Sequence, residues 1–311
     1  MKPNRLEDII ALVALYRPGP MSNISIYNDC KHKKKEPDYL HPKLKEILEP
    51  TYGVIIYQEQ VMQIAKDLAG FSLGQADILR RAMGKKKKEE MEEQRSSFIE
   101  GCLKRDVKKD YAENLFDQIE TFAGYGFNRS HSVGYALIAY QTAWLKTHYP
   151  ASFMASILSC EMDSTDRIQM FVEECKNMDL NIKKPDINES EYLFLDLDEE
   201  TILYGLGAIK GVGQTLIEKI QEERKHNLFK NIDDFCLRMG KSRINKRVLN
   251  ALIGSGAMDS LGERASLFLN AEKILKKTDH ILERQKSGIS DFFGENEVTE
   301  NTIIQDKEEL E

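Results

Sequence analysis

GAIKGVGQTLIEKIQEER, residues 207–224, contains a glycine-rich turn followed directly by a helix-like run. Gly211 and Gly213 alternate with apolar residues, the pattern of a helix-hairpin-helix turn. Such a turn can point its backbone amides outward at the start of the next helix, where they hold a phosphate without reading a base. We therefore predict that Lys210, Gly211 and Gly213 bind duplex DNA; a plain helix–helix turn is the alternative.

The surrounding residues extend this helical pattern. LIGSGAMDSLG, residues 252–262, resembles a second, weaker copy of the turn. Helices are expected near 231–239, 244–254 and 261–285. Two strand-like runs around an acidic turn within 183–207 predict a β-hairpin. Asp196 and Asp198 in that turn have the spacing of a metal-binding pair, but an exposed acidic turn is the favoured interpretation.

The first half of the chain is also predicted to be mainly helical. TYGVIIY, residues 51–57, predicts a short strand because it is rich in β-branched and aromatic residues. A helix ended by Gly70 follows, and Ser72 with Gln75 forms a capping box for the next one. One helix face is formed by Val61, Ile64, Ala65 and Leu68.

Further helices are expected near 89–105, 111–123, 151–160 and 165–178. Residues 133–148 are apolar on nearly every side of the predicted helix, so we expect the central, buried helix of the first domain here.

FAGYGFNRSHS, residues 122–132, precedes that apolar helix. We expect Ser132 to cap the helix. Gly124 and Gly126 would allow close approach of a ligand. Donors beside a helix N-terminus favour anions, so a phosphate or nucleotide contact is predicted for Asn128, Arg129, Ser130 and His131.

LRRAMGKKKK, residues 79–88, holds six basic residues and no acid. This concentration suits phosphate neutralisation. The alternative is a solvated helix face on which Asp77 pairs with Arg81 four residues later.

Composition narrows the class of protein. The 311 residues suggest two modest domains, and no apolar run approaches the length of a membrane span. Five scattered cysteines without a CxxC pair argue against zinc and a disulfide framework, and favour a reduced, cytoplasmic setting. The net charge of −7 arises mostly from residues 295–311, an acidic tail predicted to be disordered. The short aromatic segment ISDFFG, residues 289–294, predicts either a partner-docking peptide or core packing.

Several stretches together resemble the alpha subunit of bacterial DNA polymerase III, the C-family of replicative polymerases. They follow the family's order over residues 6–294 and are ALVALYRPGPM, TYGVIIYQEQVMQIA, LRRAMGKKK, FAGYGFNRSHS, YQTAWLKTHYPASFMA and GLGAIKGVG. The resemblance covers the family's fingers region and the tandem helix-hairpin-helix region after it. It implies a mainly α fold with small β elements: fingers in 1–182, helix-hairpin-helix and clamp-motif-like segments in 183–294, and the tail in 295–311.

The resemblance also implies an activity, DNA-directed DNA synthesis from deoxynucleoside triphosphates. In such polymerases two Mg²⁺ ions held by palm aspartates drive phosphoryl transfer. Matching motifs imply contacts with nucleotide or primer–template for Arg17, Tyr57, Gln58, Arg80, Arg81, Lys85, Lys86, Asn128, Arg129, Ser130 and His131. Sliding-clamp binding is implied for Asp291, Phe292 and Phe293. Other holoenzyme subunits are further implied partners.

The chain departs from the family pattern in ways that bear on activity. The palm carboxylates and the amino-terminal phosphoesterase-like domain are expected to be missing, so we expect no metal-bound catalytic residue and no cofactor in this chain alone, with Mg²⁺ arriving only with a palm. Ile289 stands where the family's clamp motif usually has Gln, and Arg129 stands where Lys is commoner. Two hypotheses remain: a polymerase fragment, inactive alone, that needs a separate palm, and a stand-alone, non-catalytic DNA-binding module.

Overall fold

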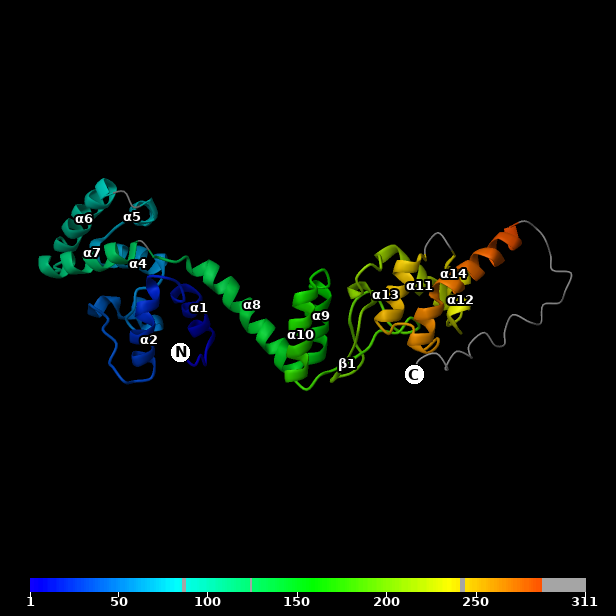
Figure 1. Cartoon of the computed structure of the whole chain (residues 1–311). Coiled ribbons are helices and arrows are strands. Elements are labelled where there is room, and N and C mark those ends of the chain that lie inside the picture. Colours follow the sequence, from blue (N-terminus) through cyan, green and yellow to red (C-terminus); the bar gives the residue numbers. More distant parts are fainter. Residues whose placement is uncertain (86–87, 124, 241–243, 287–311) are drawn as a thin grey trace. The chain divides into compact units, whose positions relative to one another are not determined.

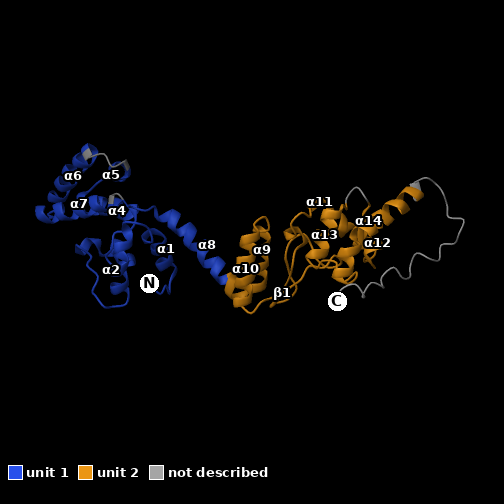
Figure 2. Ribbon diagram, in the orientation of Figure 1, with its two compact units in different colours: residues 1–144 blue, residues 145–311 orange. Residues whose placement is uncertain are grey.

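The computed structural model describes residues 1–85, 88–123, 125–240 and 244–286 (Figure 1). In this part of the chain the fold is mainly α with one small sheet, as the sequence predicts. The chain divides into two compact units, Met1–Trp144 and Leu145–Glu311 (Figure 2). The functional limits expected at 182 and 294 stay predictions, since the division at Trp144 reflects packing alone.

Unit 1 is built from helices around two apolar clusters. The larger cluster joins α4 to α7, and Leu79, Phe98 and Phe116 lie at its fully buried centre. The smaller cluster packs α1 and α2 against Ile56 and Tyr57. The helices are α1 (Leu6–Leu15), α2 (Ile24–Lys31), α3 (Lys45–Leu48), α4 (Gln58–Ala69), α5 (Leu73–Lys85), α6 (Lys88–Leu103), α7 (Lys109–Ala123) and α8 (Arg129–His148).

Helix α4 confirms the predicted periodicity. Its predicted face, Val61, Ile64, Ala65 and Leu68, is fully buried. Gly70 adopts a φ of +73° and ends the helix, a conformation that glycine tolerates without strain. The Ser72 amide donates to Gln75 Oε1 at 2.9 Å and the Gln75 amide donates to Ser72 Oγ at 3.3 Å, so the predicted capping box of α5 is also confirmed.

The strand predicted for residues 51–57 is absent. Residues Glu49–Thr51 form a 3₁₀ turn, and Tyr52 follows in the left-handed conformation. Only Tyr57 makes a bridge, parallel to Phe127. Because the β-branched side chains are apolar, they enter the helical core, where Ile55 and Ile56 are buried. No second strand lies beside them among the residues that the structure describes.

The prediction of a buried central helix at 133–148 is wrong. The helix exists as α8, but Ser132 and Ala136 are its only residues in the buried class. Leu137, Ile138 and Tyr140 are each more than 40% exposed. Figure 2 shows α8 extending away from the rest of unit 1 after its first turns. Apolar character on every side of a helix predicted burial, but only the first two turns meet the core of this unit.

Unit 2 combines two helical clusters with the sheet. Helices α9 (Pro150–Cys160) and α10 (Thr165–Asn177) pack against the sheet. The strands β1 (Asn181–Lys183), β2 (Leu195–Asp196) and β3 (Thr201–Leu203) lie in the order β1-β3-β2. The antiparallel β2–β3 pair confirms the predicted hairpin, whereas the parallel pairing of β1 with β3 was not predicted.

The remaining helices of unit 2 surround a second core centred on Ile217, Phe235 and Leu252. They are α11 (Gln214–His226), α12 (Ile232–Met239), α13 (Lys246–Gly254) and α14 (Arg264–Lys286). Of the helices described, none combines the length and hydropathy required to cross a membrane.

A fully buried carboxylate joins α1 to α2 in unit 1. Asp8 accepts hydrogen bonds from Lys31 Nζ, from the Asn4 amide at 3.1 Å and from Tyr27 Oη at 3.0 Å. Burial opposes ionisation of Asp8, but these donors together with Arg5 outweigh it and lower its pKa to about 2.

This carboxylate should make unit 1 sensitive to acid. The unfolded-state pKa of an aspartate is near 3.9, so the contribution of ionised Asp8 is complete above about pH 5 and is lost as the pH falls toward 2. The shift corresponds to about 2 kcal/mol. Asp8→Asn should lower the free energy of unfolding at pH 7 by at least this amount and should flatten its decline between pH 5 and 2. Urea unfolding at several pH values measures both effects; an unchanged acid-side slope in the variant would contradict the assignment.

Candidate nucleic-acid interface

The loop 125–131 is fixed against the N-terminus of α4. The Gln58 amide donates to Phe127 O at 3.0 Å, and the Phe127 amide donates to Ile56 O at 3.4 Å. Gln58 Nε2 also donates to Gly126 O at 3.0 Å. The structure therefore brings the predicted residues Tyr57 and Gln58 beside a loop that lies about 70 positions further along the chain.

Arg17 holds the same loop from the other side. Its guanidinium donates to Ala14 O at 2.9 Å and to Tyr125 O at 2.7 Å, and its Cζ lies 4.4 Å from the centre of the Phe127 ring. Partial burial lowers the pKa of Arg17. Because these hydrogen bonds run to backbone carbonyls, Arg17 supports the loop. Its predicted contact with nucleotide or primer–template stays a prediction.

Two glycines in this region, Gly19 and Gly126, allow close packing of neighbouring side chains. Gly19 has a φ of +100°, and a Cβ there would come within 2.3 Å of the Tyr125 ring. A Cβ on Gly126 would meet Phe122 at 2.9 Å and Gln58 at 3.1 Å. The close approach expected for a ligand at Gly126 is thus taken by side chains of the protein. Gly124 lies outside the described residues.

The N-terminus of α8 is capped differently from the prediction. The helix begins at Arg129, and the His131 amide donates to Asn128 Oδ1 at 2.9 Å, so Asn128 is the capping residue. Ser132 lies within the helix, fully buried, and its Oγ has no hydrogen-bond partner among the described residues. The prediction failed because Asn is an equally good cap and stands four residues earlier.

Glu59 occupies the position predicted for an anion. Its carboxylate accepts from the Arg129 amide at 3.1 and 3.0 Å and from Asn128 Nδ2 at 2.9 Å. A carboxylate at a helix N-terminus is stabilised by the unpaired amides and the helix dipole. A phosphate could use the Arg129 amide only by displacing Glu59.

Three predicted residues of the loop face solvent. Ser130 and His131 are exposed, and the His131 ring lies between the rings of Phe127 and Tyr135, at 5.5 and 4.7 Å between centres. The Arg129 guanidinium is also exposed, 5.8 Å from the centre of the Tyr57 ring. Tyr57 itself is only 4% exposed. The predicted set therefore divides into residues that build the loop and residues that remain available to a ligand.

The first two basic residues after Leu79 form ion pairs with an acidic residue of the same helix. Asp77 receives ion pairs from Arg80 at 2.7 Å and from Arg81 at 2.5 Å, so the pair expected from the alternative interpretation is present. Lys85 is the last residue of α5, and Lys86 lies outside the described residues.

The contact between Glu59 and α8 should be measurable as stability. Glu59→Ala leaves the Arg129 amide and Asn128 Nδ2 without their acceptor, which should lower the free energy of unfolding by about 1–2 kcal/mol. Chemical denaturation followed by circular dichroism measures the change. Glu46→Ala, at an exposed position on α3, should change stability by less than about 0.5 kcal/mol. Equal effects of the two variants would refute the capping role.

The glycine turn of unit 2 leaves its amides open. Gly211 has a φ of +93°, and Gly213 precedes the first turn of α11 in an extended conformation. The amides of Gly211, Gly213 and Gln214 donate to no acceptor among the described residues, and all three residues are exposed. A Cβ on Gly213 would meet nothing within 4 Å. Exposed amides without an acceptor are the feature that phosphate binding requires.

The sequence did not lead us to predict one cation beside this turn, Arg247. Arg247 on α13 is exposed, and its Nε lies 4.0 Å from the point that a Cβ of Gly211 would occupy. Lys210 is exposed on the turn itself. Lys219 contributes less, because it pairs with Glu222 at 2.8 Å and with Glu223 at 3.0 Å. The basic run KSRINKR at 241–247 was the available sequence signal for Arg247.

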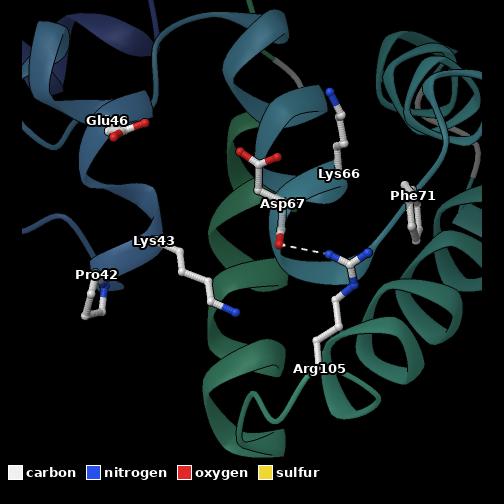
Figure 3. Close-up of a pocket in the computed structure, with 7 residues that line it drawn as sticks. All are labelled: Pro42, Lys43, Glu46, Lys66, Asp67, Phe71 and Arg105. Carbon is white, nitrogen blue, oxygen red and sulfur yellow. Dashed lines mark hydrogen bonds between the residues drawn. The ribbon is translucent and has the colours of Figure 1, made fainter.

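The pockets of unit 1 do not gather the predicted residues. A pocket of about 620 Å³ at the C-terminal end of α4 is lined by Pro42, Lys43, Glu46, Lys66, Asp67, Phe71 and Arg105 (Figure 3). Arg105 reaches across it to donate to Asp67 O at 3.3 Å. Because carboxylates and cations alternate around it, the pocket favours no single charge. A larger cavity of about 930 Å³ is bordered by Gly19 and Tyr125 behind the loop.

Comparisons with known proteins agree on one family. Residues 1–106 match the bacterial DNA polymerase III alpha subunit finger domain, and residues 179–267 match the helix-hairpin-helix motif. The chain is 49% identical over 317 residues to a DNA polymerase III subunit alpha of Pseudomonas fluorescens, covering 94% of this chain and 27% of that protein. Proteins of the same name from Vibrio cholerae and Escherichia coli are each 50% identical over 303 residues, covering 94% of this chain and 26% of theirs.

Over 94% of its length the chain is similar to part of bacterial DNA polymerase III alpha subunits, and residues 1–106 match their finger domain. This confirms the resemblance drawn from the sequence. The chain spans about a quarter of the length of these relatives.

The cations beside the second glycine turn, residues 252–262, form ion pairs within the chain. Gly256 has a φ of +83°, and the Arg264 guanidinium packs against it. Asp259 accepts from Arg264 at 2.5 Å and from Lys184 at 2.6 Å, and these bonds, led by Arg264, lower the pKa of Asp259 to about 2. The cations nearest this turn are thus neutralised, in contrast to Lys210 and Arg247. The segment predicted to bind the clamp, including Asp291, Phe292 and Phe293, lies outside the described residues.

Proposed function

We propose that this chain grips the primer–template duplex and positions the incoming deoxynucleoside triphosphate within a DNA-directed DNA polymerase. Duplex binding takes place at the turn 209–214, and nucleotide or template contact takes place at residues 129–131. We assign the chemical step to a palm, as the resemblance implies. The observation that carries the proposal is that the exposed residues Gly211, Gly213 and Gln214 have backbone amides without an acceptor among the described residues.

The turn has the features of a site for a backbone phosphate. Three amide donors without acceptors stand at the N-terminus of α11, whose thirteen residues contribute a favourable dipole. Lys210 and Arg247 supply charge on two sides. Amides and cations contact phosphates in any sequence, so the binding is independent of base sequence and sensitive to salt.

The nucleotide contact rests on the residues of the loop that face solvent. Arg129 offers a fork of donors suited to phosphate oxygens, and Ser130 and His131 add hydrogen-bonding groups in the same turn. Arg17, Gln58 and Glu59 hold the backbone that carries them. In this proposal Arg17, Tyr57 and Gln58 act as positioning residues.

We assign metal-assisted catalysis to the palm and not to the residues described in this chain. No group of three or more His, Cys, Asp or Glu side chains is arranged to hold a metal ion within residues 1–85, 88–123, 125–240 and 244–286. Asp196 accepts from Ser152, and the Asp198 carboxylate accepts from the Glu200 amide at 2.9 Å, so both belong to local structure. We therefore derive no step through Mg²⁺ in this chain.

A second candidate function is duplex binding alone. Glu59 already occupies the Arg129 amide, whereas the amides of the unit 2 turn are open. A chain of this kind would hold DNA and leave nucleotides unbound.

Substitution of the two cations should reveal the phosphate contacts. Lys210→Ala and Arg247→Ala should each reduce the slope of log affinity against log salt concentration by about 0.9, because each removes one phosphate neutralisation. Fluorescence anisotropy with a labelled duplex between 50 and 300 mM salt measures the slope. Lys276→Ala on α14, whose ammonium pairs with Glu272, serves as control and should leave the slope unchanged. Three equal slopes would refute the proposed duplex site.

Primer extension separates the two functions. With Mg²⁺ and all four deoxynucleoside triphosphates, the chain alone should not extend a primer, and addition of a separately expressed palm fragment should restore extension. Arg129→Ala should then reduce extension at least tenfold, because one charge-assisted phosphate contact is worth about 1.5–3 kcal/mol. Duplex binding without extension in either mixture would favour the non-catalytic module. Extension by the chain alone would overturn the assignment of chemistry to a palm.

A further inference from the structure

The cavity of about 930 Å³ in unit 1 is bounded by residues of both apolar clusters of that unit. Ala14, Leu15 and Ile56 belong to the smaller cluster. Ile55 and Phe122 belong to the larger cluster or pack against it. Small-molecule sites in proteins have volumes of about 300–1,000 Å³ and mostly apolar walls with a few polar groups. The cavity therefore has the size and the walls of a small-molecule site.

Aromatic side chains form part of the lining. Tyr52, Phe122 and Tyr125 all border the cavity, and Tyr125 is 46% exposed. Aromatic rings attract one another in edge-to-face and offset-stacked arrangements, beyond what burial of their area contributes. These three residues therefore favour a ligand that carries an aromatic ring.

A hydroxyl group of the lining has no acceptor. Tyr111 borders the cavity from α7, and its buried Oη has no hydrogen-bond partner among the described residues. Burial raises the pKa of Tyr111 to about 12, so the hydroxyl keeps its proton at neutral pH and can donate it to a hydrogen bond. A buried donor without an acceptor is costly, and a ligand with a carbonyl oxygen would supply the acceptor.

The charged residues that line the cavity disfavour an anionic ligand. Glu36 and Asp38 stand against Lys35, and all three side chains are exposed. Asp117 also lines the cavity and pairs with Arg95 at 2.6 Å. A phosphate or a nucleotide would meet more carboxylate than ammonium here. The apolar walls and this balance of charge both favour an uncharged molecule.

We propose that the cavity binds an uncharged aromatic molecule with a carbonyl oxygen that accepts a hydrogen bond from Tyr111 Oη. The ring of the ligand packs among Tyr52, Phe122 and Tyr125. This site is additional to the proposed contacts with duplex and nucleotide, because it selects against the charge that both of those ligands carry.

The cavity shares residues with the loop 125–131. Tyr125 borders the cavity, and its carbonyl oxygen accepts from Arg17 at 2.7 Å. Gly19 also borders it, and a Cβ there would come within 2.3 Å of the Tyr125 ring. A ligand that contacts Tyr125 therefore changes the surroundings of the loop that leads to Arg129. The effect on nucleotide contact rests on the proposed function, whereas binding in the cavity does not.

Two probes that differ at one carbon test the site. Acetophenone has an aromatic ring and a carbonyl group, and ethylbenzene has a methylene in place of that carbonyl. In methyl NMR spectra of the whole chain, both probes should shift the signals of Ile26, Val54 and Ile55 and leave Ile217 of unit 2 in place. Tyr111→Phe should weaken acetophenone about three- to tenfold and leave the affinity for ethylbenzene unchanged, because it removes one hydrogen bond.

Matched variants control for folding and for position. Tyr111→Phe should keep the melting temperature of the ligand-free chain, because Oη has no described partner to lose. Ile26→Asp adds a charge to the lining and should weaken both probes. Ile78→Asp, on α5 and outside the lining, should weaken neither, although the two isoleucines are similarly exposed at 43% and 51%.

The opposite results would overturn the proposal. If acetophenone leaves the three lining signals in place, the cavity takes no such ligand. Equal losses of affinity for both probes in Tyr111→Phe would deny the hydrogen bond, and benzoate binding as tightly as acetophenone would deny the selection against anions. The Arg129 amide signal should shift together with the lining signals, and an unmoved signal would remove the link to the loop.

Duplex binding is measured on the same preparations by fluorescence anisotropy. Failure of acetophenone to bind, together with salt-dependent DNA binding, refutes the cavity site and leaves the proposed function standing. Acetophenone binding without DNA binding refutes the proposed duplex site and leaves the cavity site standing.

Discussion

Every α-helix begins with backbone amides that have no acceptor inside the helix. In this chain these amides have side-chain acceptors at one helix and, among the described residues, none at another. At α8, Glu59 and Asn128 accept from the Arg129 and His131 amides. At α11, the amides of Gly213 and Gln214 are left to solvent. The first arrangement uses the amides to fix a loop in place. The second leaves them available, and the proposed duplex grip depends on that difference.

The same distinction runs through the charged residues. Arg17 donates a hydrogen bond to Tyr125 O, and Lys219 forms an ion pair with Glu222. Arg129 and Arg247 are exposed beside the two proposed contact points. A basic residue in a motif is thus weak evidence for ligand contact until its partners are known. Where the partners are backbone carbonyls or carboxylates of the protein, its first role is structural.

Sequence reasoning succeeded where a residue's neighbours lie close in the chain. The buried face of α4, the capping box at Ser72 and the β2–β3 hairpin all follow from spacings of three to eight residues. It failed where partners lie far away. Glu59 reaches α8 across about 70 positions, and the parallel pairing of β1 with β3 spans about 20. The burial of α8 was mispredicted because an apolar sequence indicates that a helix tends to be buried, but it does not indicate that the burying surface lies within the same unit.

The central claim is that the amides of the turn 209–214 hold a DNA phosphate. Its most direct test is the amide nitrogen–proton NMR spectrum of the ¹⁵N-labelled chain during titration with two duplexes of unrelated sequence. The account predicts that the Gly211, Gly213 and Gln214 signals shift alike with both duplexes, whereas the Gly254 signal at the far end of α13 stays in place. Saturable DNA binding with those three signals unmoved would contradict the account and would place the duplex on another surface.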